Sequence, residues 1–205
     1  MGQVIISIGR EFGSGGHEIA QKIANHYAVK LYDKNILNEV AKEKHVNRKE
    51  FKGIDEKIRN KFLYRTVNGM NSSPEDNLAE LQFDFIRERA DEGESFVIVG
   101  RCSETVLRGN PSLITIFING DWEQKVQRTK ELFNLSDEDA EDYVESENIK
   151  RKRYHNSHSK NKWGDSRNYE LTVNSSVFGI DGTVDILIMY IDERIKLMER
   201  DEEEQ

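Results

Sequence analysis

The chain has 205 residues, a formal net charge of −8 at pH 7 and a single cysteine, Cys102. The length fits one domain with a sizeable core, the negative charge argues against wholesale binding to nucleic acid or to an acidic membrane, and one cysteine excludes an intramolecular disulfide. No apolar run approaches the roughly 20 residues of a membrane span, and no basic-then-apolar leader precedes the first apolar run, so we expect a soluble cytoplasmic protein.

The first predicted elements are a β-branched strand over Val4–Ile8 and an amphipathic helix over Glu18–Tyr27, joined by a glycine-rich turn. Glycine reaches positive φ at little cost, so the backbone can approach an anion closely, and the start of the helix directs unpaired N–H groups at that anion. The turn consists of Gly13, Ser14, Gly15, Gly16 and His17. This layout favours a phosphate-binding loop, although a tight strand–helix connection without a ligand has a similar composition.

The loop departs from the usual nucleotide-binding pattern G-x-x-x-x-G-K-[ST]. Arg10 occupies the position of the first glycine, Gly16 that of the lysine and His17 that of the hydroxyl residue. A guanidinium group at the end of a strand suits bidentate phosphate contact. We therefore hypothesise that Arg10 replaces the absent lysine in space, and that magnesium is held largely by water, with Ser14 as a candidate protein ligand.

The rest of the chain alternates apolar strands with helical stretches, which is typical of a parallel sheet covered by helices on both faces. The further predicted strands are Lys30–Tyr32, Phe96–Val99, Leu113–Ile118 and Leu171–Val173. The further predicted helices are Lys34–Lys44, Leu78–Glu92, Glu123–Phe133, Asp137–Tyr154 and Val184–Glu199. Ser73 or a neighbour is expected to cap the second of these helices. The expected architecture is a three-layer α/β/α fold with ligands at the carboxyl ends of the strands.

Charged residues follow the predicted strands at their carboxyl ends, which is where an open α/β sheet places its ligands. Asp33 follows the second strand and Arg101 the third, so that Arg101 and Arg10 put two arginines at this edge. Two arginines suit a polyanionic ligand. Alternatively, Arg101 caps the edge of the sheet or pairs with Asp33 or Glu104. The neighbouring Cys102 is expected to be a buried, inert thiol.

A basic segment, residues 150–162, follows a predicted acidic helix that starts with a capping box at Ser136 and Asp139. Such a segment can form a mobile lid that closes over phosphates and supplies cations to the transition state. It can equally be a solvated helix face or an RNA contact. The histidines lack the spacing of zinc ligands, and His155 and His158 are expected on a polar surface.

Several segments together resemble the cytidylate-kinase-like family of the P-loop nucleoside-monophosphate kinases. These segments are residues 8–16 (IGREFGSGG), 31–33 (LYD), 96–102 (FVIVGRC), 116–118 (IFI), 163–165 (WGD) and 168–171 (NYEL). The resemblance implies a P-loop kinase fold in one domain over residues 1–205, with a five-stranded parallel sheet. It also implies a helical acceptor-binding insertion at about residues 35–92 and a helical lid at about residues 134–165.

The activity that the resemblance implies is ATP-dependent phosphoryl transfer, with Mg²⁺, to a nucleoside monophosphate or a similar small acceptor. Position by position, it assigns donor contacts to Gly13, Ser14, Gly15, Gly16, His17 and Arg128, acceptor contacts to Asp33 and Arg101, and catalysis to Arg10, Arg151 and Arg153.

The chain departs from this family at positions that bear on catalysis. The loop lysine and hydroxyl are absent, Cys102 stands where the acceptor motif usually has aspartate, and Asn148 stands at a lid position that is usually acidic. A nucleotide-binding regulator with weak or no kinase activity is therefore an alternative, and an RNA-contacting protein that uses residues 150–162 is a third. We expect a small-molecule acceptor without nucleic-acid or membrane partners, and allow a homo-oligomer.

Overall fold

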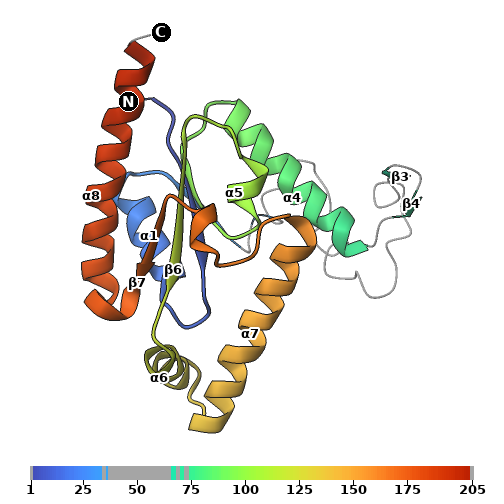
Figure 1. Cartoon of the computed structure of the whole chain (residues 1–205), viewed down its shortest axis with the longest axis vertical. Coiled ribbons are helices and arrows are strands. Elements are labelled where there is room, and N and C mark those ends of the chain that lie inside the picture. Colours follow the sequence, from blue (N-terminus) through green and yellow to red (C-terminus); the bar gives the residue numbers. More distant parts are fainter. Residues whose placement is uncertain (1, 34–35, 37–65, 68–69, 72–73, 204–205) are drawn as a thin grey trace.

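The computed structural model describes residues 2–33, 36, 66–67, 70–71 and 74–203. The parallel strands among them are β1 (Ile5–Arg10), β2 (Lys30–Tyr32), β5 (Phe96–Val99), β6 (Leu113–Asn119) and β7 (Leu171–Asn174). They form one sheet in the order β2-β5-β1-β6-β7, with β1 at its centre. A separate antiparallel pair, β3 (Thr66–Val67) and β4 (Met70–Asn71), lies away from this sheet (Figure 1).

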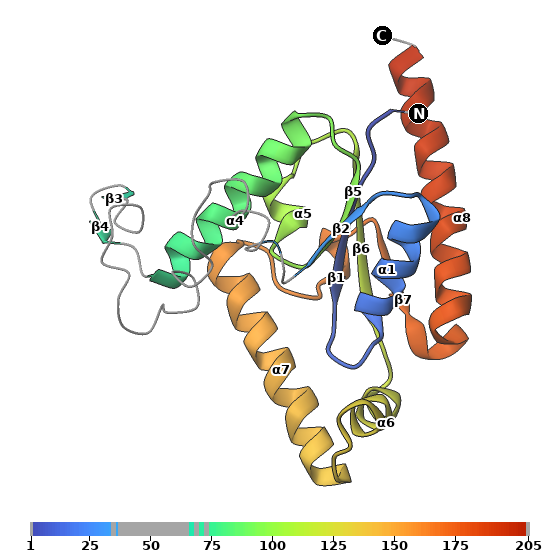
Figure 2. The same cartoon turned by 180° about the vertical axis from the view of Figure 1, so that it is seen from behind.

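Helices cover both faces of the sheet, as Figure 1 and, from behind, Figure 2 show. On one face lie α1 (Gly16–His26) and α8 (Ser175–Glu203), and on the other lie α4 (Pro74–Asp91) and α5 (Ser103–Val106). This arrangement confirms the predicted three-layer α/β/α fold with a five-stranded parallel sheet. Among the described residues, no helix has the length and apolar character needed to cross a membrane.

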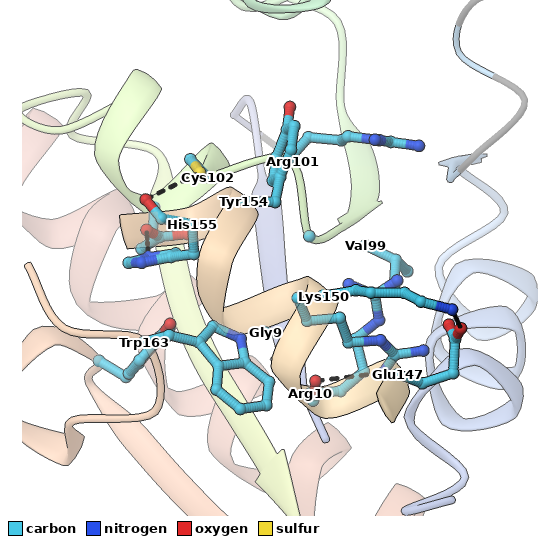
Figure 3. A pocket seen from close by; sticks show the side chains of 14 residues that line it. Gly9, Arg10, Val99, Arg101, Cys102, Glu147, Lys150, Tyr154, His155 and Trp163 are labelled. Carbon is cyan, nitrogen blue, oxygen red and sulfur yellow. Dashed lines mark hydrogen bonds and ion pairs between the residues drawn. The ribbon is translucent and has the colours of Figure 1, made fainter. Parts of the chain in front are cut away.

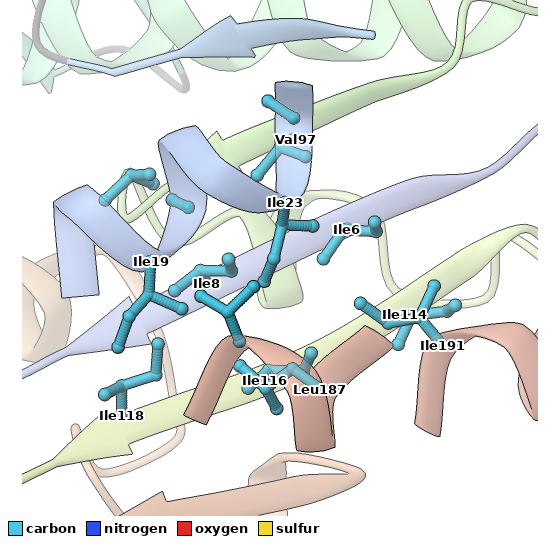
Figure 4. Packing of buried hydrophobic residues seen from close by; sticks show 14 of the residues in the cluster. Ile6, Ile8, Ile19, Ile23, Val97, Ile114, Ile116, Ile118, Leu187 and Ile191 are labelled. Atoms are coloured by element: carbon cyan, nitrogen blue, oxygen red, sulfur yellow. The ribbon is translucent and has the colours of Figure 1, made fainter. Parts of the chain in front are cut away.

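Successive side chains of a strand point to opposite faces of the sheet. Because helices cover both faces here, the strand sequences are almost continuously apolar. In β1, Ile6 and Ile8 face α1 and α8, whereas Ile5 faces α4. Figure 4 shows the first of these faces, where Ile23 of α1 and Leu187 of α8 meet isoleucines of β1 and β6. Burying each such side chain contributes about 1.5–3 kcal/mol. Packing on both faces therefore fixes the place of the carboxyl end of β1.

Two helices extend beyond the carboxyl ends of the strands, α6 (Trp122–Phe133) and α7 (Asp137–His158) (Figure 1). The predicted cap at the start of α7 is confirmed, because Ser136 Oγ accepts the Asp139 N–H at 3.2 Å. A short 3₁₀ helix, Ser166–Asn168, follows α7 and leads into β7. The α6–α7 hairpin therefore stands beside the sheet edge at which the predicted ligand residues lie.

The structure extends several predicted elements. β1 continues to Arg10, two residues past the predicted end, and α8 begins at Ser175 with a kink at Gly179, where φ is 67°. The sequence does not predict the four-residue helix α5, because so short a helix has no detectable periodicity. The predicted helix over residues 34–44 (apart from Ile36), the cap at Ser73 and much of the predicted insertion at about residues 35–92 lie outside the described residues.

Candidate functional site

The glycine-rich turn forms a compact loop between β1 and α1. Gly13 and Gly15 have φ values of 81° and 72°, in a region that residues with a side chain rarely adopt. A Cβ at Gly13 would also lie 2.8 Å from the Cβ of Lys125 on α6, and one at Gly15 would collide with Ile180 on α8. Backbone conformation therefore favours glycine at both positions, and at Gly13 packing against the backbone of Lys125 requires it as well.

Ser14 is turned beneath the loop. Its side chain is buried, its hydroxyl donates to the Glu11 carbonyl at 2.9 Å, and Ser175 Oγ donates to the Ser14 carbonyl at 2.7 Å. The Glu11 carboxylate is in turn paired with Lys125 Nζ at 2.7 Å. Because the Ser14 side chain is buried, its position speaks against the hypothesis that its hydroxyl binds a metal at the surface of the loop.

The Arg10 side chain fills the space in which a lysine at position 16 would begin. A Cβ at Gly16 would lie 2.7 Å from Arg10 Cβ and 3.0 Å from Arg10 Cγ, well inside the contact distance of about 3.5–4.0 Å between carbon atoms. The guanidinium end reaches Gly100, where a Cβ would collide with Arg10 Nη1. In the usual pattern, glycine comes first and lysine follows the second glycine. In this chain the first position holds Arg10 and the lysine position holds Gly16, so the glycine and the basic side chain are interchanged relative to the usual pattern.

The loop borders a cavity of about 430 Å³, which we call the donor-side cavity because it is lined by the loop predicted to bind the donor phosphates. Among its lining residues are Gly13, Gly15, Gly16, His17, Arg10, Asp33, Arg128, Phe133 and Arg151. Arg128 Nη2 lies 2.6 Å from Glu18 Oε2 at the start of α1. The structure thus brings together all the predicted donor-side residues except the Ser14 side chain, and it places Asp33, predicted at the acceptor, in the donor-side cavity.

A second cavity of about 320 Å³ is lined by Arg101 and by side chains of α7 (Figure 3). We call it the acceptor-side cavity because Arg101 is predicted to bind the acceptor. Arg10 and Arg151 line both cavities. Burial, together with the neighbouring guanidinium groups of Arg151 and Arg101, lowers the pKa of Arg10 to about 9, and Asp33 opposes this shift. Burial also lowers the pKa of Arg151. Burial therefore disfavours the charged forms of Arg10 and Arg151 in the free protein. A bound polyanion would offset this electrostatic cost.

Two polar side chains of helix α7 bind the backbone or ring of residues 10–12, just before the loop. Asn148 Oδ1 accepts the Phe12 N–H at 2.7 Å, and Arg151 Nη1 donates to the Arg10 carbonyl at 3.2 Å. The Arg151 guanidinium also lies 5.1 Å from the centre of the Phe12 ring, within range of a cation–π contact. Arg153 is exposed and lines neither cavity, because two helical positions differ by a rotation of about 200°. The structure brings Arg151 to the site but not Arg153.

A turn with an unusual backbone presents Arg101. Gly100, Arg101 and Cys102 have φ values of 74°, 61° and 53°, and the left-handed conformation at non-glycine residues costs of order 1–3 kcal/mol each. Ser103 supports the turn, because its hydroxyl donates to the Gly100 carbonyl at 2.9 Å. The Arg101 guanidinium lies 5.7 Å from the centre of the Tyr154 ring on α7. Backbone strain is therefore concentrated beside the acceptor-side cavity.

The structure corrects the expected surface position of His155 and His158. His155 Nε2 lies 2.7 Å from Glu104 Oε1, with 6% and 3% of the two side chains exposed, and 11% of the His158 side chain is exposed. The nearby Cys102 is buried, as expected, and burial with the Glu104 charge raises its pKa to about 12. Sequence reasoning misses the His155–Glu104 pair because 51 positions separate its members and neither lies in a recognisable motif.

His17 stands where the usual pattern has a hydroxyl. Its Nδ1 lies 3.8 Å from Asp33 Oδ2, and 60% of its side chain is exposed. No cluster of three or more His, Cys, Asp or Glu side chains that could hold a metal occurs in the described part of the chain. An ion that accompanies nucleotide phosphates needs only one or two protein ligands, and His17 and Asp33 are side chains that the donor-side cavity offers for this purpose.

Comparisons with known proteins agree with this fold. An uncharacterized protein from Eubacterium ventriosum shares 39% identity over 93% of this chain and 99% of its own, with a TM-score of 0.73. Shikimate kinases from Bacteroides thetaiotaomicron and, in complex with shikimate, from Acinetobacter baumannii share the fold at 16% and 12% identity. Both have a TM-score of 0.53, over 92% and 93% of this chain and 98% and 94% of theirs. A search of curated proteins found no match. The model of the cytidylate kinase-like family matches residues 5–177, and the chain belongs to that family.

Proposed function

We propose that this protein is an ATP-dependent phosphotransferase. In this proposal the donor binds on the loop of residues 13–17, and a small anionic acceptor binds in the acceptor-side cavity beside Arg101. The observation that carries the proposal is that the two cavities meet at Arg10 and Arg151. Phosphoryl transfer runs in line between a donor and an acceptor oxygen and asks the protein mainly for positioning and charge neutralisation. Two adjoining cavities with arginines at their junction suit that task, and membership of a kinase-like family supports the reaction class.

On the donor side, the N–H groups of the loop and of the first turn of α1 supply hydrogen bonds to the phosphates. Arg10 supplies the cation that the lysine provides in the usual pattern. Arg128 borders the same cavity and is assigned to the nucleotide, for which it would exchange its contact with Glu18. Because Asp33 lines this cavity, we assign it to the donor side as well.

On the acceptor side, Arg101 binds an anionic group, and a nucleoside monophosphate is the proposed acceptor class. A guanidinium group matches a phosphate through two parallel hydrogen bonds. Arg151 borders both cavities and neutralises charge on the group in transfer, where removal of one preorganised donor typically costs about 3–4 kcal/mol of barrier. Arg153 has no role in this assignment. Because Arg151 is turned to the loop, this assignment removes Arg151 from the alternative RNA contact.

The protein would use ATP with a divalent ion and work in the cytoplasm, where both are supplied. A coupled ADP-release assay across nucleoside monophosphates tests the transfer. Arg101→Ala should raise the KM for the acceptor about tenfold or more, because a charge-assisted contact is lost, and should leave ATP affinity unchanged. Arg153→Ala, which replaces an exposed arginine, is the matched control and should change neither quantity.

A nucleotide-binding regulator is the second candidate. The inward-turned Ser14 hydroxyl favours it, because the loop then lacks a hydroxyl for the metal of the donor. Saturable ATP binding without acceptor-dependent ADP release would support the regulator over the kinase. Failure of ATP to bind, measured by thermal shift with and without divalent ions, would rule out both.

A further inference from the structure

The end of the loop carries an imidazole where nucleotide-binding loops of the usual pattern carry a hydroxyl. In that pattern the hydroxyl binds Mg²⁺. His17 occupies the position, is largely exposed, and borders the donor-side cavity. The Ser14 hydroxyl does not compensate, because the Ser14 side chain is buried and does not line the donor-side cavity.

Asp33 comes to the same place from the end of β2. The distance between His17 Nδ1 and Asp33 Oδ2 is 3.8 Å. Two ligands of one octahedral ion, each about 2.1 Å from it, are about 3 Å apart, and the exposed imidazole can turn through the remaining difference. The two side chains therefore converge closely enough to share an ion.

The chemistry of this pair does not match Mg²⁺ well. Magnesium prefers oxygen ligands and gives up its water reluctantly, whereas an imidazole nitrogen with a carboxylate suits first-row transition metals, whose affinities rise from Mn²⁺ through Fe²⁺ and Co²⁺ to Ni²⁺. The neighbouring Arg10 is a cation whose charge is already disfavoured by burial and by Arg151. A divalent ion alone would meet that repulsion, and an ion bound to a polyanionic nucleotide would not.

We propose that His17 and Asp33 bind a first-row divalent transition metal that enters together with the nucleoside triphosphate. This inference rests on the proposed function, since the phosphates supply the other ligands. It gives His17 a chemical role in place of the missing hydroxyl. It also predicts a metal preference that differs from that of a loop with the usual pattern.

Pulsed EPR of Mn²⁺ with a non-hydrolysable ATP analogue tests the proposal directly. With protein labelled with ¹⁵N at histidine, the wild type should show a ¹⁵N coupling to Mn²⁺ that is absent in His17→Thr. His26→Gln is the matched control, because His26 lies on the same helix and is exposed, and it should keep the coupling. Equilibrium titration should show that His17→Thr lowers the Co²⁺-over-Mg²⁺ preference of the nucleotide complex about tenfold or more.

The outcomes separate this inference from the proposed function. If the Mn²⁺–nucleotide complex binds but shows no coupling to protein nitrogen, His17 is not a ligand and the inference is overturned while nucleotide binding stands. If Asp33→Asn leaves the affinity of the nucleotide complex for Co²⁺ unchanged, Asp33 is not a ligand and the paired site is overturned. If the nucleotide fails to bind with any metal, the proposed function and the inference both fail.

Discussion

Lysine at position 16 should disrupt the loop unless Arg10 is replaced by glycine at the same time. A Cβ on residue 16 would lie 2.7 Å from Arg10 Cβ. Gly16 is the first residue of α1 and is not among the glycines with positive φ, so steric contact rather than backbone conformation is the obstacle. Overpacking of this kind costs about 1–3 kcal/mol of the free energy of unfolding, and we expect that loss for Gly16→Lys alone.

Arg10→Gly removes the atoms that a lysine side chain at position 16 would meet, and it recreates the order of the usual pattern. The double variant R10G/G16K should therefore be more stable than the sum of the two single variants predicts, with a favourable coupling of about 1–3 kcal/mol. Arg10→Ala keeps the Cβ that lies 2.7 Å away, so R10A/G16K is a control that loses the arginine without relieving the contact.

Urea denaturation of the wild type, both single variants and the double variant gives the coupling, and calorimetric titration gives the ATP affinity. Each single variant should lose about tenfold or more in ATP affinity. Arg10→Gly removes the cation, and Gly16→Lys places a second side chain in the space that Arg10 occupies. The double variant should recover most of that loss, because its lysine again reaches the phosphates. Additive stability changes, or equal recovery in R10A/G16K, would refute the idea that the two residues compete for one space.

Further predictions concern the contacts around the site. With its pKa raised to about 12, the native Cys102 thiol should react with a thiol reagent at pH 8 far more slowly than in urea; equal rates would contradict its burial. The folded thiol also keeps its proton above pH 9, where the unfolded thiol loses it. The wild type should therefore lose stability relative to Cys102→Ser as the pH rises from 9 to 12, by at most about 1.4 kcal/mol per pH unit. Asn148→Leu removes the acceptor of the Phe12 N–H and should cost about 1–3 kcal/mol in urea, whereas Asn148→Asp keeps an acceptor and should cost less; similar losses would count against this contact. His155→Ala removes the imidazole from the buried Glu104 carboxylate, which keeps the Thr105 hydroxyl, and should cost about 1–3 kcal/mol; Glu104→Leu should restore part of this, and no restoration would exclude the carboxylate as the cause.

The sheet could be predicted from the sequence because both faces of it are buried. Strands such as Phe96–Val99 contain nothing but apolar residues, and the helices between them have clear apolar periodicity. Element ends were less predictable: Gly9 and Arg10 carry no strand signal of their own, and pairing with Phe117 and Ile118 of β6 extends β1 over them.

The residue pattern alone predicts the candidate site best where one short segment carries it, whereas Arg128 and Arg151 were predicted through the family resemblance. The loop from Gly13 to His17 could be recognised because strand, turn and helix are adjacent in the chain. The competition between Arg10 and Gly16 could not, because it depends on how far a side chain reaches across the start of the next element. The burial of His155 depends on a carboxylate from a helix that is remote in the sequence. The exposure of Arg153 depends on the rotation of α7 about its axis.

Helix α7 contacts the structure on both sides of the site: Asn148 and Arg151 bind the segment that ends β1, and His155 binds α5. A rigid helix held on both sides cannot tilt toward one cavity without changing the shape of the other. Donor and acceptor should then change each other's affinity, and by linkage the factor is the same in both directions. The order in which the two substrates bind would affect the rate at which the ternary complex forms but not its free energy.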